Sequence, residues 1–516
     1  MKIKNLLTQR REDAETQSFN FIKIFINIFA PLRLCAFALI LFVFNIANFA
    51  QETPPAPSAL KSVTIPAVKE KKLANSLTVA VVERKNVPLV TVQLLVKSGA
   101  ETEGASKAGL ANMTASLLTK GTNTRTATQI AEQLEFLGGS INSGAGWNNS
   151  IVSINVMADK LDAAMAIMAD VVLNPKFDQK EIDLLKSQTL DGLNFNLKQP
   201  GFLANYVAAK YSFSEHPAGG TPDSINAIVN DEITGFHRKN YVPNKAILIF
   251  TGDLAAEKAN KLAQKYFGNW KNPETNSGDG SGQGSGRFST SKDTVKRILV
   301  LDLPNSGQAA VSYAKNLNLA NSGRTSSNYY PASVLNSLLG GGYSSRLNQE
   351  IRIKRGLSYG AGSSFAWRTV TSNFGTRTQT KNESAAEVAE LVVAEINKLA
   401  DGKIADTELN PRKLVLTGGF GRNLETTNGL AAAIADLYSF GLSTSELNSF
   451  MTSVNAVSDT QIQKFAGENL KGGDIIIVGD YAKFKDDLAK RFPSMKIEVI
   501  KADELDLSKD NLRKAK

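Results

Sequence analysis

Side chains that could hold a catalytic metal ion are scarce in this sequence. Its 516 residues include two histidines, His216 and His237, and one cysteine, Cys35. A catalytic zinc ion needs three protein ligands drawn from imidazole, thiolate and carboxylate, plus one position left open for water. We expect His216, which precedes Pro217, to be a turn residue and His237 to be structural. The small number of histidines and cysteines therefore argues against an independent metal-dependent hydrolase.

One predicted helix carries polar residues at the spacing of a metal motif. Apolar side chains recur at helical spacing over residues 109–119, which predicts an amphipathic helix. Asn112 and Ser116 share one face of it at positions i and i+4, but they offer only a neutral amide and a hydroxyl. Ala115 cannot take a proton from water, so a general base is missing there as well.

The elements around this helix alternate between strands and helices. Residues 77–83 and 89–96 are β-rich, and Val152, Ile154 and Val156 alternate with polar residues as in a half-buried strand. A capping box at residues 126–129 predicts a second helix that ends at Gly138-Gly139, and a third helix is predicted from residue 161. Interleaving of this kind predicts an α+β layer fold.

The chain is predicted to hold two homologous domains. Residues 276–286 consist mainly of Gly and Ser, a composition typical of a flexible linker. On each side, a helix is followed by a buried strand that stops at Gly-Asp, at Gly252-Asp253 and at Gly479-Asp480. We therefore predict domains at residues 69–270 and 292–495, joined by a linker at residues 271–291.

The termini have their own signatures. Arg33 precedes an apolar run over residues 34–46 that ends in small residues, as in a signal peptide occupying residues 1–50. A retained membrane anchor is the alternative, although the run is shorter than the ~20 residues that span a bilayer. Residues 51–68 are predicted to be a Pro/Ala-rich tether and residues 496–516 a charged tail. Export to a bacterial periplasm or the cell exterior is the expected location.

The net charge is positive, but it does not indicate a nucleic-acid partner. The formal charge is +10, and the first fifty residues carry six basic and three acidic side chains, which leaves +7 (10 − 3) on the remainder. These charges form no dense basic run, whereas nucleic-acid binding needs a clustered basic face. Gly340-Gly-Gly342 lacks a following G-K-[ST], so nucleotide binding is not expected either.

Several segments resemble the pitrilysin/insulinase family, which includes mitochondrial processing peptidase. Residues 109–122 are similar to the segment that carries the inverted zinc motif H-x-x-E-H in that family. The resemblance covers about residues 77–488 and implies two homologous α/β-layer domains, LuxS-like in fold, closed as a clamshell around the linker. Other matching blocks are Gly138-Gly139-x-x-Asn142, Glu215-His216-Pro217, residues 340–347 and residues 352–359.

The resemblance also implies that the catalytic positions are degenerate. The two histidine ligands correspond to Asn112 and Ser116, and the general-base glutamate corresponds to Ala115. The third ligand, a glutamate in the family, falls at Asp191 or Gly192. We therefore expect no bound metal and no cofactor in this chain, with zinc present only in a partner subunit.

Substrate-binding positions implied by the resemblance are retained. Arg352 and Tyr359 stand where active members place an arginine and a tyrosine against the substrate near the zinc. Arg can hold a substrate carbonyl or carboxylate, and a Tyr hydroxyl can donate to the oxyanion of a tetrahedral intermediate. Asn142 and Ser143 lie in a segment that resembles the edge strand pairing with extended peptides, although a plain glycine-loosened strand remains an alternative.

These observations favour a non-catalytic subunit that is inactive alone. It would pair with a zinc-bearing family subunit as a heterodimer, or with itself, and bind peptides. An inert scaffold of the same fold, comparable to the core subunits of the respiratory bc1 complex, is the main alternative. An independent peptidase with an unrecognised site is the third, and the poor ligand inventory disfavours it.

Overall fold

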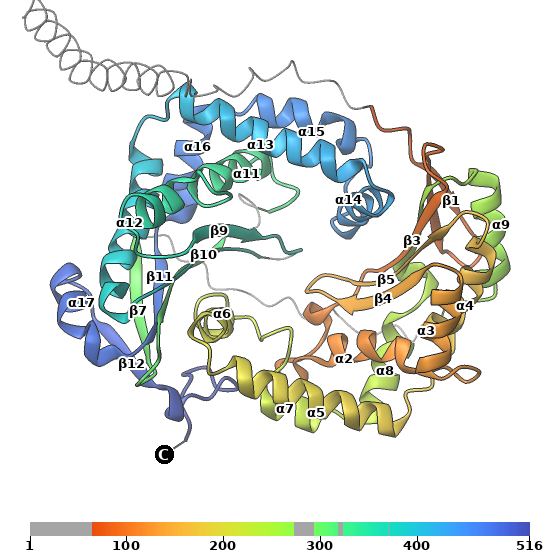
Figure 1. The fold of residues 1–516 in the computed structure, drawn as a ribbon, viewed down its shortest axis with the longest axis horizontal. Coiled ribbons are helices and arrows are strands. Elements are labelled where there is room, and N and C mark those ends of the chain that lie inside the picture. The colour runs from red at the N-terminus through yellow and green to blue at the C-terminus, as the bar shows by residue number, and fades with distance from the viewer. Residues whose placement is uncertain (1–63, 273–293, 318–322, 370, 516) are drawn as a thin grey trace, which may run out of the picture. The chain divides into compact units, whose positions relative to one another are not determined.

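The chain folds into two α+β halves, each built on a six-stranded sheet (Figure 1). The computed structural model describes residues 64–272, 294–317, 323–369 and 371–515. The predicted signal peptide and almost all of the Gly/Ser linker lie outside the described residues. None of the helices in the described ranges is long and apolar enough to cross a bilayer.

The first sheet has the strand order β1-β2-β6-β3-β5-β4. Strands β2 and β6 are parallel, and the other neighbours are antiparallel. Helices α4 and α9 pack on β5 and β2, and α2 packs on α8. The strands are Lys69–Lys72 (β1), Thr78–Glu83 (β2), Leu89–Val96 (β3), Ser140–Ala145 (β4), Ser150–Met157 (β5) and Ala246–Gly252 (β6).

The helices of the first half include the three that the sequence predicted. The buried residues of the first are Leu110, Met113 and Leu117 among others, and the second begins at a capping box between Thr126 and Gln129, as predicted. The helices are Leu110–Leu117 (α2), Ala127–Phe136 (α3), Leu161–Leu173 (α4), Gln179–Asn196 (α5), Pro200–Tyr211 (α6), Pro222–Ala227 (α7), Asn230–Asn240 (α8) and Ala256–Phe267 (α9).

The second half repeats this topology in five of its six strands, and differs at the edge, where β12 comes last in the chain and is parallel to β7, whereas β1 comes first and is antiparallel to β2. Its sheet has the order β12-β7-β11-β8-β10-β9, and parallel β7 and β11 take the place of β2 and β6. The strands are Val295–Asp302 (β7), Ala309–Leu317 (β8), Ala361–Ala366 (β9), Ser372–Thr380 (β10), Gly473–Gly479 (β11) and Ile497–Lys501 (β12). The helices are Tyr329–Leu339 (α11), Ala385–Asp401 (α12), Asp406–Leu424 (α13), Thr427–Ser439 (α14), Glu446–Asn455 (α15), Asp459–Phe465 (α16) and Lys485–Arg491 (α17). The expected α+β pair of homologous domains is confirmed.

Two segments, one near each end of the described residues, differ from their predicted structure. The segment expected as a charged tail, residues 496–516, contains β12, which pairs in parallel with β7, and Leu512, which is buried. Apolar side chains of this segment cover the edge of the second sheet, so the segment is folded although many of its residues are charged. At the other end, Ile65 of the predicted tether is buried, and its N–H donates to Asn448 Oδ1 at 2.8 Å.

Each half contributes one helix that packs on the sheet of the other half. Helix α6 packs on β8, β10 and β11, where Leu203 and Val207 are buried against Leu299 and Ile476. Helix α14 packs on β3 and β6 of the first sheet, so that a helix of one half again covers a sheet of the other. Each sheet is thereby covered on one face by its own helices and on the other by a helix from the opposite half.

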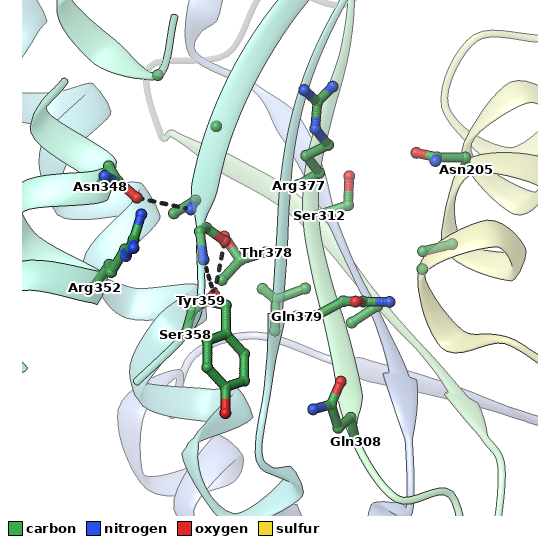
Figure 2. Close-up of a pocket in the computed structure, with 18 of the residues that line it drawn as sticks. Asn205, Gln308, Ser312, Asn348, Arg352, Ser358, Tyr359, Arg377, Thr378 and Gln379 are labelled. Carbon is green, nitrogen blue, oxygen red and sulfur yellow. Dashed lines mark hydrogen bonds between the residues drawn. The ribbon is translucent and has the colours of Figure 1, made fainter. Parts of the chain in front are cut away.

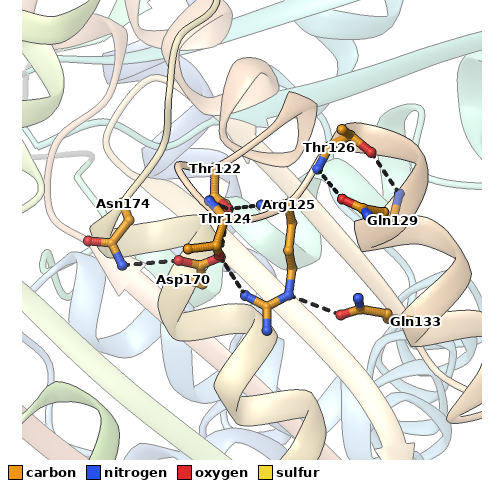
Figure 3. A network of polar contacts seen from close by, with 8 residues as sticks. All are labelled: Thr122, Thr124, Arg125, Thr126, Gln129, Gln133, Asp170 and Asn174. Carbon is orange, nitrogen blue, oxygen red and sulfur yellow. Dashed lines mark hydrogen bonds and ion pairs between the residues drawn. The ribbon is translucent and has the colours of Figure 1, made fainter.

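A buried polar cluster fixes the loop between α2 and α3 (Figure 3). Asp170 of α4 accepts hydrogen bonds from Thr122 at 2.6 Å, Thr124 at 2.8 Å and Asn174 at 3.0 Å, and pairs with Arg125 at 2.6 Å. Burial alone would raise the pKa of Asp170, but these donors together hold it below its ordinary value. The carboxylate stays charged and ties the loop to α4.

The exchange of helices predicts that α14 matters to the stability of the whole chain. Leu430 of α14 is fully buried. Leu430→Ala is expected to lower the free energy of unfolding by about 2–4 kcal/mol, through lost burial and the cavity left behind. Leu184→Ala, at a position that is 53% exposed on α5, is the matched control, with an expected loss below about 1 kcal/mol. Equal midpoints for the two variants in urea would contradict this packing role.

Candidate functional site

Helix α2, which carries the degenerate positions, is anchored at its N-terminus by a buried carboxylate. Glu103 accepts hydrogen bonds from the N–H groups of Gly109 at 2.7 Å and Ala111 at 2.6 Å. These are helix N-terminal donors without intrahelical partners, and a negative charge suits that end of the helix dipole. His216 Nε2 lies 3.2 Å from the same carboxylate, and its ring packs 5.0 Å from the ring of Trp147.

The structure brings Asn112, Ser116 and Gly192 together. They line one pocket of about 280 Å³ between α2, α5, α6 and α7. Ser116 Oγ lies 3.4 Å from Asn112 Oδ1, so the two positions do share a helix face. A Cβ at Gly192 would meet open space, and Asp191 is absent from the pocket lining, so of these two residues only Gly192 lies in the pocket. Ala115 is fully buried and does not line the pocket.

The residues in this pocket do not fit a catalytic zinc ion. Its polar side chains are amides and hydroxyls, including Gln188, Thr189 and Asn196, and none of its lining residues is charged. Zinc prefers imidazole, thiolate and carboxylate, which supply negative charge or a strong nitrogen donor. Among the described residues, no three His, Cys, Asp or Glu side chains lie close enough to hold a metal ion together.

His237 has a structural environment. Its Nε2 lies 2.9 Å from the carbonyl oxygen of Val172, and its ring stacks on Tyr241 at 4.9 Å. Burial lowers the pKa of His237, because the charged imidazolium would lose hydration there.

Arg352 and Tyr359 lie together in a second pocket, of about 710 Å³ (Figure 2). Arg352 is in the π-helical turn Asn348–Ile353, and its guanidinium packs 4.9 Å from the centre of the Tyr343 ring. Asn348 Oδ1 accepts a hydrogen bond from Ala361 N at 3.3 Å, which ties this turn to β9. The Tyr359 side chain is 91% exposed. Its hydroxyl is therefore available to a ligand.

Helix α6 borders both pockets. Phe202 and Tyr206, whose rings stack at 4.3 Å, line the pocket with the degenerate positions. Gly201 and Asn205 line the pocket with Arg352 and Tyr359. A Cβ at Gly201 would lie 2.6 Å from Nε2 at the end of the Gln379 side chain, so Gln379 of β10 packs directly on α6 at this glycine. The two pockets are thus separated by the width of one helix.

Asn142 and Ser143 are on an edge strand, as predicted, but line neither of these two pockets. β4 pairs with β5 and ends the first sheet, so its other edge is unpaired within that sheet. Asn142 is exposed, whereas Ser143 is half-buried and its Oγ is buried without a hydrogen-bond partner. An edge strand of this kind can accept an extended peptide, although charged and glycine-rich edges often stay unpaired.

Sequence reasoning missed several further polar residues of the larger pocket, among them Asn205, Arg377 and Gln379. Arg377 and Gln379 are exposed on β10 and alternate with the buried residues Thr376, Thr378 and Thr380. That alternation is visible in the sequence and could have assigned Arg377 and Gln379 to one face of a strand. The contribution of Asn205 could not be found in this way, because it comes from the opposite half.

The two halves also meet through polar contacts. Glu215 of the first half lies 3.3 Å from Arg368 and accepts a hydrogen bond from Asn373 Nδ2 at 2.9 Å. Near α14, Thr251 Oγ1 donates to the carbonyl oxygen of Thr427 at 2.7 Å. These contacts lie beside the exchanged helices, where Asn373 Oδ1 and Gln93 Oε1 are buried without a hydrogen-bond partner.

Comparison with known proteins places both halves in one family. Residues 78–207 match the insulinase family, also described as peptidase family M16, and residues 227–416 match the peptidase M16 inactive domain. An uncharacterized zinc protease of Mycobacterium leprae is 27% identical over 342 residues, which are 66% of this chain and 75% of that protein. One from Rickettsia bellii is 29% identical over 57% of this chain and 68% of its own.

Solved structures agree with the fold. A peptidase M16 inactive domain from Pseudomonas fluorescens superposes with a TM-score of 0.71 at 24% identity, covering 80% of this chain and 98% of its own. A protease from Helicobacter pylori gives a TM-score of 0.74 at 21% identity, covering 81% of this chain and 100% of its own. The chain is a two-domain α+β protein of the peptidase class. It belongs to the pitrilysin/insulinase family, peptidase family M16.

If α2 and α5 lack only the metal-binding side chains, introducing such side chains at the same positions should create a zinc site. The variant Asn112→His/Ser116→His/Gly192→Glu would supply two imidazoles and one carboxylate from positions that line one pocket. We expect it to bind about one equivalent of zinc, measured by titration against a chromogenic chelator.

The matched control is Asn112→His/Ser116→His/Gly235→Glu. It carries the same side chains, but it moves the carboxylate to Gly235 of α8, which is outside that pocket. Equal zinc affinity of the two triple variants would show that α5 does not place its side chain toward α2.

Proposed function

We propose that this protein is a non-catalytic subunit of an exported, insulinase-like zinc peptidase. In this role it binds peptides with Arg352 and Tyr359 beside a partner subunit that carries the H-x-x-E-H site. The supporting observation is the contrast between its two pockets. One has no zinc ligands, while the other keeps the arginine and an exposed tyrosine.

The proposed roles of the two residues follow from their chemistry. The guanidinium of Arg352 has donors arranged in a fork and cannot lose its charge, so it can hold a peptide carbonyl or carboxylate in place. The hydroxyl of Tyr359 can donate a hydrogen bond to the oxyanion that would develop at the peptide carbonyl during hydrolysis. In this proposal zinc and the general base come from the partner, and this chain supplies orientation and charge stabilisation.

Export and pairing belong to the same proposal. The apolar run at residues 34–46 supports passage across a membrane, with the mature chain periplasmic or secreted. A heterodimer is favoured over self-association, because two copies of this chain would still lack the zinc ligands.

The test is reconstitution with the H-x-x-E-H family subunit encoded in the same genome. We expect this chain alone to leave a fluorogenic peptide intact and the mixture to cleave it. In the mixture, Arg352→Ala or Tyr359→Phe should lower kcat/KM by roughly 10²–10³, the loss typical of one oxyanion donor.

Controls of the same type lie outside the pocket. Arg238→Ala changes an exposed residue of α8 and Tyr266→Phe a half-buried residue of α9, and both should leave turnover as in the wild type. Size-exclusion chromatography must show that every variant still forms the complex. Unchanged turnover for both Arg352→Ala and Tyr359→Phe would refute the proposed role and leave the inert scaffold as the better account.

A further inference from the structure

The pocket that holds Arg352 and Tyr359 carries positive charge and no negative charge. Arg352 and Arg377 are its charged lining residues, and it contains no Asp or Glu. Several other buried or half-buried guanidiniums of the second half have carboxylate partners, as in the pairs of Arg346 with Glu408 at 2.7 Å and Arg297 with Asp474 at 2.6 Å, whereas half-buried Arg412 contacts Ser344. Among the described residues, no ion pair is found for Arg352 or Arg377.

Arg377 is held so that its side chain reaches the pocket. It lies on β10, where Thr376 and Thr378 on either side are buried. Its neighbour on the edge strand β9 is Gly362, which has no side chain to cover it. In Figure 2 the base of the Arg377 side chain lies near Ser312 and its guanidinium extends toward the top of the view, while Asn205 of α6 lies on the opposite side.

We propose that this pocket selects peptides that carry a carboxylate, with Arg377 as the residue that binds it. The inference rests on the proposed function, because it names the class of peptide that the Arg352/Tyr359 pocket takes. Arginine donates two parallel N–H bonds to a carboxylate, and such charge-assisted pairs are shorter and stronger than neutral ones. The neutral side chains of Asn205, Ser312 and Gln379 remain available to the polar groups of a peptide.

The same charge arrangement disfavours basic peptides. A Lys or Arg side chain in this pocket would face two guanidiniums, with no carboxylate in the lining to offset the repulsion. The proposed selectivity for peptides therefore combines attraction of carboxylates with repulsion of Lys and Arg side chains. The carboxylate has two sources, an Asp or Glu side chain and the C-terminus of the peptide, and both present the same chemistry to Arg377.

The experiment measures peptide binding to the full-length chain by isothermal titration calorimetry, without a partner subunit. One peptide sequence is made with Glu, Gln or Lys at alternating positions, each as a free C-terminal acid and as an amide. We expect roughly 5- to 30-fold tighter binding for at least one carboxylate form than for its neutral counterpart. This range lies between an exposed ion pair and a desolvated one. The Glu/Gln comparison reports a side-chain carboxylate, and the acid/amide comparison reports a C-terminal one.

The variant Arg377→Gln should remove this preference, whereas Arg238→Gln, the same charge change on α8 outside the pocket, should retain it. The inference is overturned by equal dissociation constants for all the peptides, by a preference that survives Arg377→Gln, or by no binding up to about 1 mM. These outcomes are independent of turnover. A carboxylate preference without any effect of Tyr359→Phe on the reconstituted enzyme would refute the proposed function alone, and the reverse result would refute this inference alone.

Discussion

The exchange of one helix between the two halves is the packing interaction on which the rest of the structure depends. A sheet that buries both faces needs two apolar layers, and each half supplies only one for its own sheet. Helix α6 supplies the missing layer of the second sheet, and α14 supplies that of the first. Neither half can bury both faces of its sheet alone, so the linker joins two parts that depend on each other for their cores.

This exchange also determines where chemistry is possible. Because α6 leaves the first half to pack on β8, β10 and β11, its Gly201 and Asn205 reach the pocket that contains Arg352 and Tyr359. The same helix closes the degenerate pocket with Phe202 and Tyr206. A helix required for the core therefore forms a wall between the two pockets, so the residues that α2 and α5 place in one pocket do not reach the arginine pocket.

Periodicity and capping in the sequence predicted the local elements well, because these signals act over a few residues. The capping box at Thr126 and the buried stripe of α2 are examples, and the Gly/Ser linker separated two repeats that share the order of five strands. Contacts between the halves could not be predicted, since no local pattern encodes them. Asn205 in the arginine pocket was missed for this reason. The strand β12 was missed because its partner β7, in the same half, is about 200 residues away in the sequence. Choosing between Asp191 and Gly192 likewise required the structure, because the sequence does not show which residues of α5 face the pocket.

Family membership and the chemistry of this chain point in different directions, since its relatives carry the name zinc protease while its own pocket has amides and hydroxyls at the ligand positions. Elemental analysis of the purified wild-type chain, after incubation with zinc and removal of free metal, tests the account most directly. We predict less than about 0.1 equivalents of zinc, because neutral oxygen donors cannot compete with water and buffer for the ion. Retention of about one equivalent, lost when Asn112 and Ser116 are both changed to alanine, would contradict it.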